Sequence, residues 1–210
     1  MTYKNLQDEC ILLRFDESRR ASVKSWLNTR YAAIWSMEDW YFKHVTGVPF
    51  TVTAGDDGPT MFSDFAAVEG LFDNNGDPLR WLPQRIFEEV YLGDTSSSTP
   101  REYTIVDRQI ILGPTPSATT TFYISYRRRL SHVDGPSGLN AAGIMVNDSD
   151  QPIWGAEYDY LLVLEAAILG CELLEFPAAE LSSQRDGMLQ ALLGDALHSQ
   201  QSAGVEIWGE

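Results

Sequence analysis

Apolar residues between Val23 and Val45 recur at steps of three and four, the spacing of a helix with one buried stripe. Trp35 and Trp40 widen this stripe, and each buried aromatic side chain removes about 150–250 Å² from water. We therefore predict a scaffold helix here that is buried on more than one side. Its stripe consists of Val23, Trp26, Leu27, Tyr31, Ile34, Met37, Tyr41 and Phe42.

A shorter helix is predicted over residues 1–15, because Leu6, Cys10 and Leu13 share one face at helical spacing. Thr2 is suited to cap its first turn. After it, the side chain of Asp16 or Ser18 can accept a hydrogen bond from the free N–H groups that open the long helix.

Two more helices are predicted near the C-terminus. The run from Glu157 to Glu175, introduced by Pro152 and Trp154, leaves almost no polar surface, which predicts a buried helix that packs on the long one. Pro177 ends it, and an amphipathic helix follows over residues 178–198. Its apolar face contains Leu181, Met188, Leu189, Leu192, Leu193 and Leu197.

The middle of the chain has the two-residue alternation and the turn residues that are typical of β-strands. We predict that residues 65–72 and 79–82 form a hairpin, with Asn75-Gly76 at its tip. Residues 102–106 and 109–112 form a second hairpin. Further strands are expected at 50–54 and 118–130, and a short helix at 84–91.

These patterns predict an α+β protein in which the two ends of the chain meet in one helical bundle. Residues 1–47 and 152–199 form the bundle, and residues 48–130 form a β-rich insertion that resembles a sandwich or barrel. Residues 131–151 are predicted to form an extended loop, and loops of that length are either functional or disordered. The tail 200–210 is polar except for Val205, Ile207 and Trp208, which have no local apolar partner.

The formal net charge of −15 argues against gripping nucleic acid or an anionic membrane surface, both of which require clustered Lys and Arg. The chain lacks an opening signal segment and an apolar run of about 20 residues, so we predict no membrane association. Cys10 and Cys171 lie in separate apolar runs and are expected to be free buried thiols, as in a reducing cytoplasm.

Motifs for catalysis or for cofactor binding are missing, so we predict neither an enzyme, nor a cofactor, nor a metal. The three histidines, at 44, 132 and 198, are scattered and lack a second ligand at metal spacing. The acidic residues Asp73 and Asp77 faintly resemble a calcium loop, but the closing Glu is missing, and a hairpin tip explains them better.

Arg127, Arg128 and Arg129 form the only basic run. One interpretation is that the end of a strand exposes its charges to water or to nearby carboxylates. The other is a contact with an acidic partner surface, such as another subunit.

The order of these parts resembles the head-to-tail connector family of tailed bacteriophages, the adaptor or head-completion proteins beneath the portal. Three segments carry the resemblance: the aromatic opening helix with its Trp26-Leu27-Asn28 and Ile34-Trp35 steps, the segment from Ile110 to Arg128, and Pro152-x-Trp154-x-x-x-Tyr158. The middle segment reads Ile110-x-Leu112-x-Pro114-x-Pro116 and then Phe122-x-Ile124-x-Tyr126-x-Arg128.

The resemblance implies a structural virion protein at the head–tail interface, assembled in the host cytoplasm. It implies a ring of about twelve copies that docks on the portal protein and offers a surface to a tail-side neck, stopper or terminator protein. Genomic DNA would pass through the lumen without specific binding. Val205, Ile207 and Trp208 become candidates for the portal contact, and Arg127, Arg128 and Arg129 for an inter-subunit or partner contact.

The alternative is a monomeric β-sandwich module that recognises carbohydrate or peptide through exposed aromatic residues such as Trp81 and Tyr103. A hydrolase that uses the acidic loops is a third interpretation.

Overall fold

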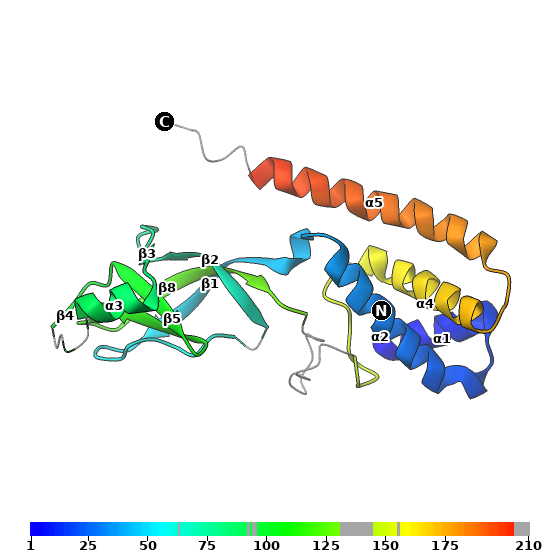
Figure 1. Cartoon of the computed structure of the whole chain (residues 1–210), viewed down its shortest axis with the longest axis horizontal. Coiled ribbons are helices and arrows are strands. Elements are labelled where there is room, and N and C mark those ends of the chain that lie inside the picture. Colours follow the sequence, from blue (N-terminus) through cyan, green and yellow to red (C-terminus); the bar gives the residue numbers. More distant parts are fainter. Residues whose placement is uncertain (63, 92, 94–95, 131–144, 155, 204–210) are drawn as a thin grey trace. The chain divides into compact units, whose positions relative to one another are not determined.

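The computed structural model describes residues 1–62, 64–91, 93, 96–130, 145–154 and 156–203, without the side chains of 157 and 196–203. The chain divides into two compact units (Figure 1). The helical unit comprises Met1–Phe42 and Leu130–Glu210, and the β unit comprises Lys43–Arg129. Each unit is described below by itself.

The helical unit contains α1 (Tyr3–Arg14), α2 (Arg20–Met37), α4 (Asp159–Leu173) and α5 (Ala179–Ala203). One cluster of buried side chains draws on all four helices, which confirms that both ends of the chain build one bundle. Thr2 caps α1 as predicted, since its hydroxyl accepts a hydrogen bond from the Asn5 N–H. Asp16 caps the short 3₁₀ turn Glu17–Arg19 by accepting the Ser18 N–H, whereas α2 itself begins after Arg19 without a side-chain cap, so the cap predicted for the long helix is wrong.

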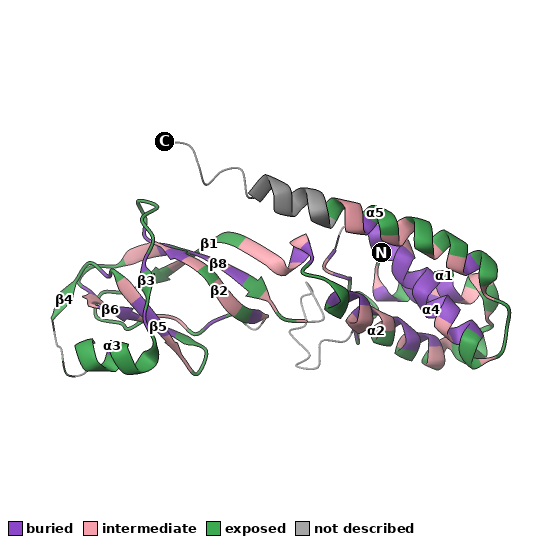
Figure 2. Cartoon of the chain, turned by 45° about the horizontal axis from the view of Figure 1, so that its top comes forward, coloured by how far each residue is buried: buried purple, intermediate pink, exposed green. Residues whose placement is uncertain are grey.

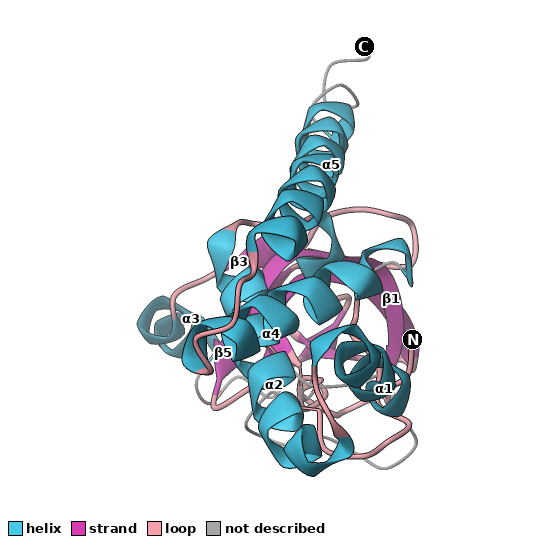
Figure 3. Cartoon of the chain, turned by 90° about the vertical axis from the view of Figure 1, so that its right-hand side faces the viewer, coloured by secondary structure: helices cyan, strands magenta, loops and turns pink. Residues whose placement is uncertain are grey.

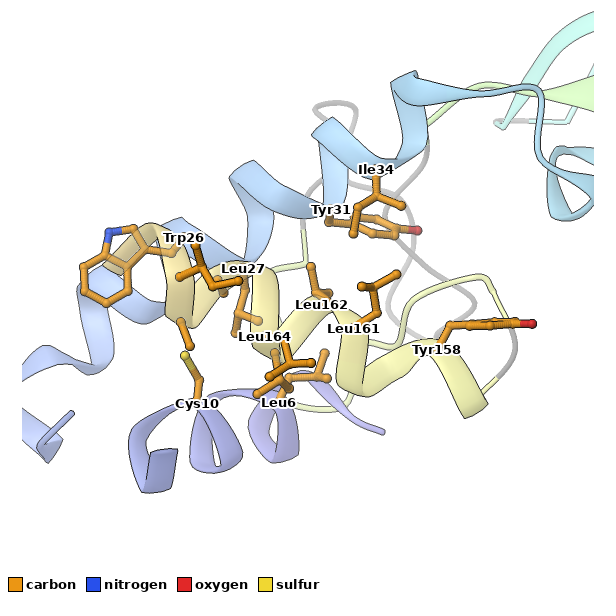
Figure 4. Close-up of a cluster of buried hydrophobic side chains, with 14 of the residues drawn as sticks. Leu6, Cys10, Trp26, Leu27, Tyr31, Ile34, Tyr158, Leu161, Leu162 and Leu164 are labelled. Carbon is orange, nitrogen blue, oxygen red and sulfur yellow. The ribbon is translucent and has the colours of Figure 1, made fainter. Parts of the chain in front are cut away.

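Helix α4 is the centre of this unit, because α1, α2 and α5 all pack against it (Figures 2 and 3). Eleven of its fifteen residues are buried, so this helix has no exposed side, as its apolar sequence predicts. Figure 4 shows Leu6 and Cys10 pointing from α1 toward α4, with Leu6 beside Leu164, and Leu27 and Tyr31 of α2 on the other side of α4.

The scaffold helix is shorter than predicted and buries one stripe only. Helix α2 ends at Met37, and the following Glu38 is extended. The reason is that the chain folds back: the Trp40 indole donates a hydrogen bond of 2.6 Å to the Ile34 carbonyl and stacks on Phe42. The aromatic residues after Met37 therefore fill the core from a turn, and not from a continuing helix.

The β unit contains two three-stranded sheets that share one core. The first has the order β1-β8-β2 and is antiparallel, with β1 at His44–Val52, β2 at Phe65–Phe72 and β8 at Thr120–Arg128. The second has the order β3-β5-β6, with β3 at Arg80–Trp81, β5 at Glu102–Val106 and β6 at Gln109–Gly113. A short pair joins β4 (Ser97–Ser98) to β7 (Thr115–Pro116), and α3 covers Gln84–Tyr91.

The second predicted hairpin is confirmed, since β5 and β6 pair through a turn at Asp107 and Arg108. The first is wrong beyond its tip. The Asp73 carboxylate accepts backbone N–H bonds from Asn75 and Asp77 and closes a compact turn. Pro78 then pairs with Phe72, and the Leu79 N–H donates to the Leu71 carbonyl, but the return strand goes no further along β2. The chain then leaves, and Arg80 pairs in parallel with Glu102 of β5.

Candidate interaction surfaces

The structure separates the three arginines of the basic run. Arg128 is held within the β unit, because its Nε lies 3.0 Å from Oδ2 of Asp64. The same carboxylate accepts a hydrogen bond from the Tyr126 hydroxyl. Arg127 and Arg129, whose side chains alternate with that of Arg128 along the chain, are exposed.

Arg127 lies on the outer face of the β1–β8–β2 sheet, opposite His44 on β1 and Ala67 on β2. His44 contacts Glu69 across this face, with 2.6 Å between Nδ1 and Oε1. The outer face thus offers a polar surface that contains one exposed arginine. Of the sequence-predicted contact residues, Arg127 and Arg129 are exposed, and Arg128 pairs with Asp64.

The other predicted contact residues, Val205, Ile207 and Trp208, lie outside the described residues. Helix α5 leads to them, and its attachment to α4 is described. Leu181 and Leu192 are buried against the bundle, and the Tyr158 hydroxyl donates a hydrogen bond to Asp195.

A charged cluster also ties α5 to the bundle. Glu165 of α4 is buried and lies 2.9 Å from Nη1 of Arg185 on α5 and 3.6 Å from Nε of Arg30 on α2. One carboxylate therefore joins three helices. Periodicity marks Glu165 only as a polar residue in an apolar helix, so sequence analysis missed its role.

The predicted loop 131–151 falls into two parts. Residues 131–144 lie outside the described residues. Residues 145–151 are anchored: the Asn28 amide bonds both the N–H and the carbonyl of Met145, and the buried Asp150 carboxylate accepts the N–H of Val146. This second part is therefore not a free extended loop, because a buried polar network holds it against the helices.

Charge is distributed unequally between the units. The helical unit carries seven Lys and Arg against nineteen Asp and Glu, a net charge of −12, whereas the β unit carries eight against eleven, a net charge of −3. Because both units hold a similar number of basic residues, the acidic excess of the protein is a property of the helical unit.

One end of the helical unit exposes large apolar side chains. Leu12 in the last turn of α1 is 79% exposed, and Leu173 and Phe176 at the end of α4 are also exposed. Arg14 in the same turn of α1 lies 3.5 Å from Glu180 at the start of α5, so this end of α1 lies near the segment that follows α4. We call Leu12, Leu173 and Phe176 the apolar end patch. Exposed apolar groups of this kind mark protein contacts.

The aromatic platform expected of a sugar- or peptide-binding module is not formed as predicted. Trp81 is 55% exposed, but Tyr103 is only 5% exposed, because its ring belongs to the core shared by the two sheets.

The two thiols behave as predicted, free and buried. Burial raises the pKa of Cys10 to about 12, with a smaller contribution from the neighbouring Cys171. A thiol that stays protonated is a poor nucleophile and a poor metal ligand.

Within the described residues, no group of three His, Cys, Asp or Glu side chains could hold a metal ion. The described helices include none that is long and apolar enough to cross a membrane.

The exposed apolar side chains of the helical unit are typical of a protein that assembles with other proteins. The family model "SU10 adaptor protein" matches residues 1–207, so the chain belongs to this family of phage head–tail adaptors. It is accordingly a bacteriophage adaptor protein and a component of the virion, and a structural family of this kind is not normally enzymatic. No curated protein matches the chain.

Proposed function

We propose that the chain forms a closed ring of about twelve copies beneath the portal, extends the DNA channel and presents an attachment surface to the tail. The observation that carries this proposal is the family match over residues 1–207. The match includes the helices of both chain ends and the β unit, so both units belong to the part of the chain that the family model describes.

The acidic helical unit supports the channel part of the proposal. About twelve copies of a chain with net charge −15 place roughly −180 in one ring before counterions bind. A surface of this sign repels phosphate and lets DNA move without being held. A channel lined mainly by Lys and Arg would contradict this part of the proposal.

For the portal contact we propose Val205, Ile207 and Trp208. They follow α5, and no neighbouring position in the sequence offers them an apolar partner. For the contact between subunits we propose Arg127 and Arg129, which are exposed and could face the acidic helical unit of a neighbouring copy. Coulomb attraction would favour that arrangement.

Co-assembly with the portal tests the proposal. The purified chain is mixed with portal rings, and native mass spectrometry reads the stoichiometry. We expect a complex with a fixed number of copies that forms a ring by electron microscopy. A chain that stays monomeric and leaves the portal unoccupied would contradict the proposal.

Two sets of variants separate the contacts. Val205→Ser, Ile207→Ser and Trp208→Ser together should abolish docking while leaving the thermal unfolding of the chain unchanged. Arg127→Glu with Arg129→Glu should weaken association between copies. Arg85→Glu is the control for the reversal of an exposed charge, because Arg85 is also exposed and lies on α3 of the same unit.

A further inference from the structure

The β unit contains a cavity between α3 and the β5–β6 hairpin, with a volume of about 290 Å³. Phe87 and Tyr91 of α3 form one wall. Thr104 of β5 and Leu112 of β6 form the floor, and Asp57 borders it from the segment that runs beside β6. Ligand pockets generally measure about 300–1,000 Å³, so this cavity suits a single side chain better than a whole cofactor.

The walls of the cavity are fixed by short contacts. A Cβ atom at Gly113 would lie 2.6 Å from the Tyr91 ring and 2.7 Å from the Phe87 ring, so α3 packs directly on the strand. The Tyr91 hydroxyl donates a hydrogen bond of 2.8 Å to Glu102. On the other side, the Leu112 N–H donates to the Asp57 carbonyl at 2.8 Å. A preformed cavity costs its occupant little ordering.

The lining of the cavity is negative. It includes the carboxylates Asp57 and Glu88, and the described residues that line it include no Lys, Arg or His. Tyr91, the last residue of α3, also lines it. The C-terminal end of a helix carries partial negative charge and attracts cations. The faces of the Phe87 and Tyr91 rings attract cations as well.

The lining also contains a hydroxyl group. Thr104 is 2% exposed, its backbone pairs with Ile111, and the residue lines the cavity. An occupant with a polar head could form a hydrogen bond with this hydroxyl.

We propose that this cavity receives an arginine side chain presented by a partner protein. The charge of the lining selects a cation, and the aromatic rings with Val106 and Leu112 receive an apolar stem. A guanidinium fits better than an ammonium, because it stacks on aromatic rings and directs five donors in a plane. The carboxylates and the Thr104 hydroxyl are separate acceptors around the cavity, and they can accept hydrogen bonds from different N–H groups of one guanidinium. This inference does not depend on the ring or on the portal contact.

The test uses the full chain and the peptide acetyl-Gly-Arg-Gly-amide, observed by saturation-transfer difference NMR. We expect saturable binding, with the strongest transfer to the arginine side chain. The same peptide with citrulline, which keeps the shape and loses the charge, should bind at least fivefold more weakly. Spermidine, a free organic cation, should also bind more weakly than the arginine peptide.

Two exposed carboxylates provide the variants, and a neighbour provides the control. Asp57→Asn and Glu88→Gln should each weaken binding by about two- to fivefold, as expected for exposed ion pairs. Glu89→Gln removes the same charge from α3, but Glu89 pairs with Arg85 and does not line the cavity, so binding should be unchanged. Circular dichroism confirms that each variant is folded.

Three results would overturn the inference: absence of binding by the arginine peptide, equal binding of the citrulline peptide, or tighter binding of spermidine. Equal losses in Glu88→Gln and Glu89→Gln would also overturn it, because the effect would then come from the overall charge and not from the cavity.

Discussion

The helical unit and the β unit differ in net charge and in the side chains that they expose. The helical unit carries a net charge of −12 and the β unit −3, although their basic residues are nearly equal in number. The helical unit also bears the apolar end patch, and the β unit bears the exposed arginines of the basic run. In the proposed ring, the acidic helical unit would repel the phosphates of DNA in the channel, whereas the nearly neutral β unit suits contacts with protein.

The cores of the two units differ as well. In the helical unit a single helix, α4, contacts all the others, whereas in the β unit two sheets share the core. Damage to α4 should therefore affect the whole helical unit, while each unit keeps its own core. The predictions below test this comparison, beginning with the largest effect.

The largest effect is expected from truncating one fully buried side chain in each unit. Leu164→Ala and Phe122→Ala should each cost about 2–5 kcal/mol of unfolding free energy, since both side chains are completely buried. Hydrogen exchange, read by mass spectrometry, should show lost protection only in the unit that carries the change. Equal loss of protection in both units would show that they do not have separate cores.

The next effect concerns the tight packing of α4. Gly170→Ala should cost about 1–3 kcal/mol, because a Cβ atom there would lie 2.5 Å from the Trp26 ring and 2.7 Å from the Phe15 ring. Gly187→Ala on α5 is the matched control, since it would meet nothing within 4 Å. That control should gain up to about 1 kcal/mol from helix propensity. Chemical denaturation measures both, and similar losses would contradict the packing described for Gly170.

A smaller effect is expected from the carboxylate that joins three helices. Glu165→Gln should cost about 1–3 kcal/mol, because Arg30 and Arg185 lose a buried counter-charge. Glu172→Gln removes an exposed carboxylate 3.7 Å from Arg30 and should change stability by less than about 0.5 kcal/mol. Equal losses in the two variants, measured by urea denaturation, would remove the special role of Glu165.

The smallest effect appears in alkaline solution. Burial raises the pKa of Tyr3 from 10.0 to about 12, partly offset by the hydrogen bond from Asn28. The folded state therefore favours the protonated phenol, so its contribution is complete below pH 10 and is lost as the pH rises toward 12. By pH 11 the folded state should have lost about 1 kcal/mol of unfolding free energy through the titration of Tyr3.

Tyr3→Phe isolates this contribution. Urea midpoints of the wild type and of the variant should converge between pH 9 and pH 11, because the variant lacks the group that titrates. A constant difference over this range would show that Tyr3 does not titrate differently on folding.

Sequence pattern predicts the helical unit better than the β unit. The periodicity of apolar residues was sufficient to predict helices α1, α4 and α5, because the spacing of a buried helical face follows from the local geometry of the helix. It failed at the end of α2, where the Trp40 indole bonds back to Ile34 and aromatic residues continue the core without continuing the helix. The spacing of apolar residues after Met37 still resembles that of a helix, so spacing alone does not show where α2 ends.

In the β unit, pattern located β2, β5, β6 and β8, but it placed the first strand at 50–54, whereas β1 is His44–Val52. Pattern also did not identify all of the strand partners. The parallel pairing of Arg80 with Glu102 joins distant segments, and alternation along one strand carries no information about its neighbour. The candidate contacts show the same limit. The arginine run was visible in the sequence, but only the fold shows that Arg128 pairs with Asp64 while Arg127 and Arg129 are exposed.

The most direct test is a cryo-electron-microscopy reconstruction of the neck in intact virions. The account predicts a closed ring of this chain between portal and tail, with the C-terminal residues 205–208 against the portal and a channel of negative potential. A neck that lacks this chain, or one in which it forms a positively charged channel, would contradict the account.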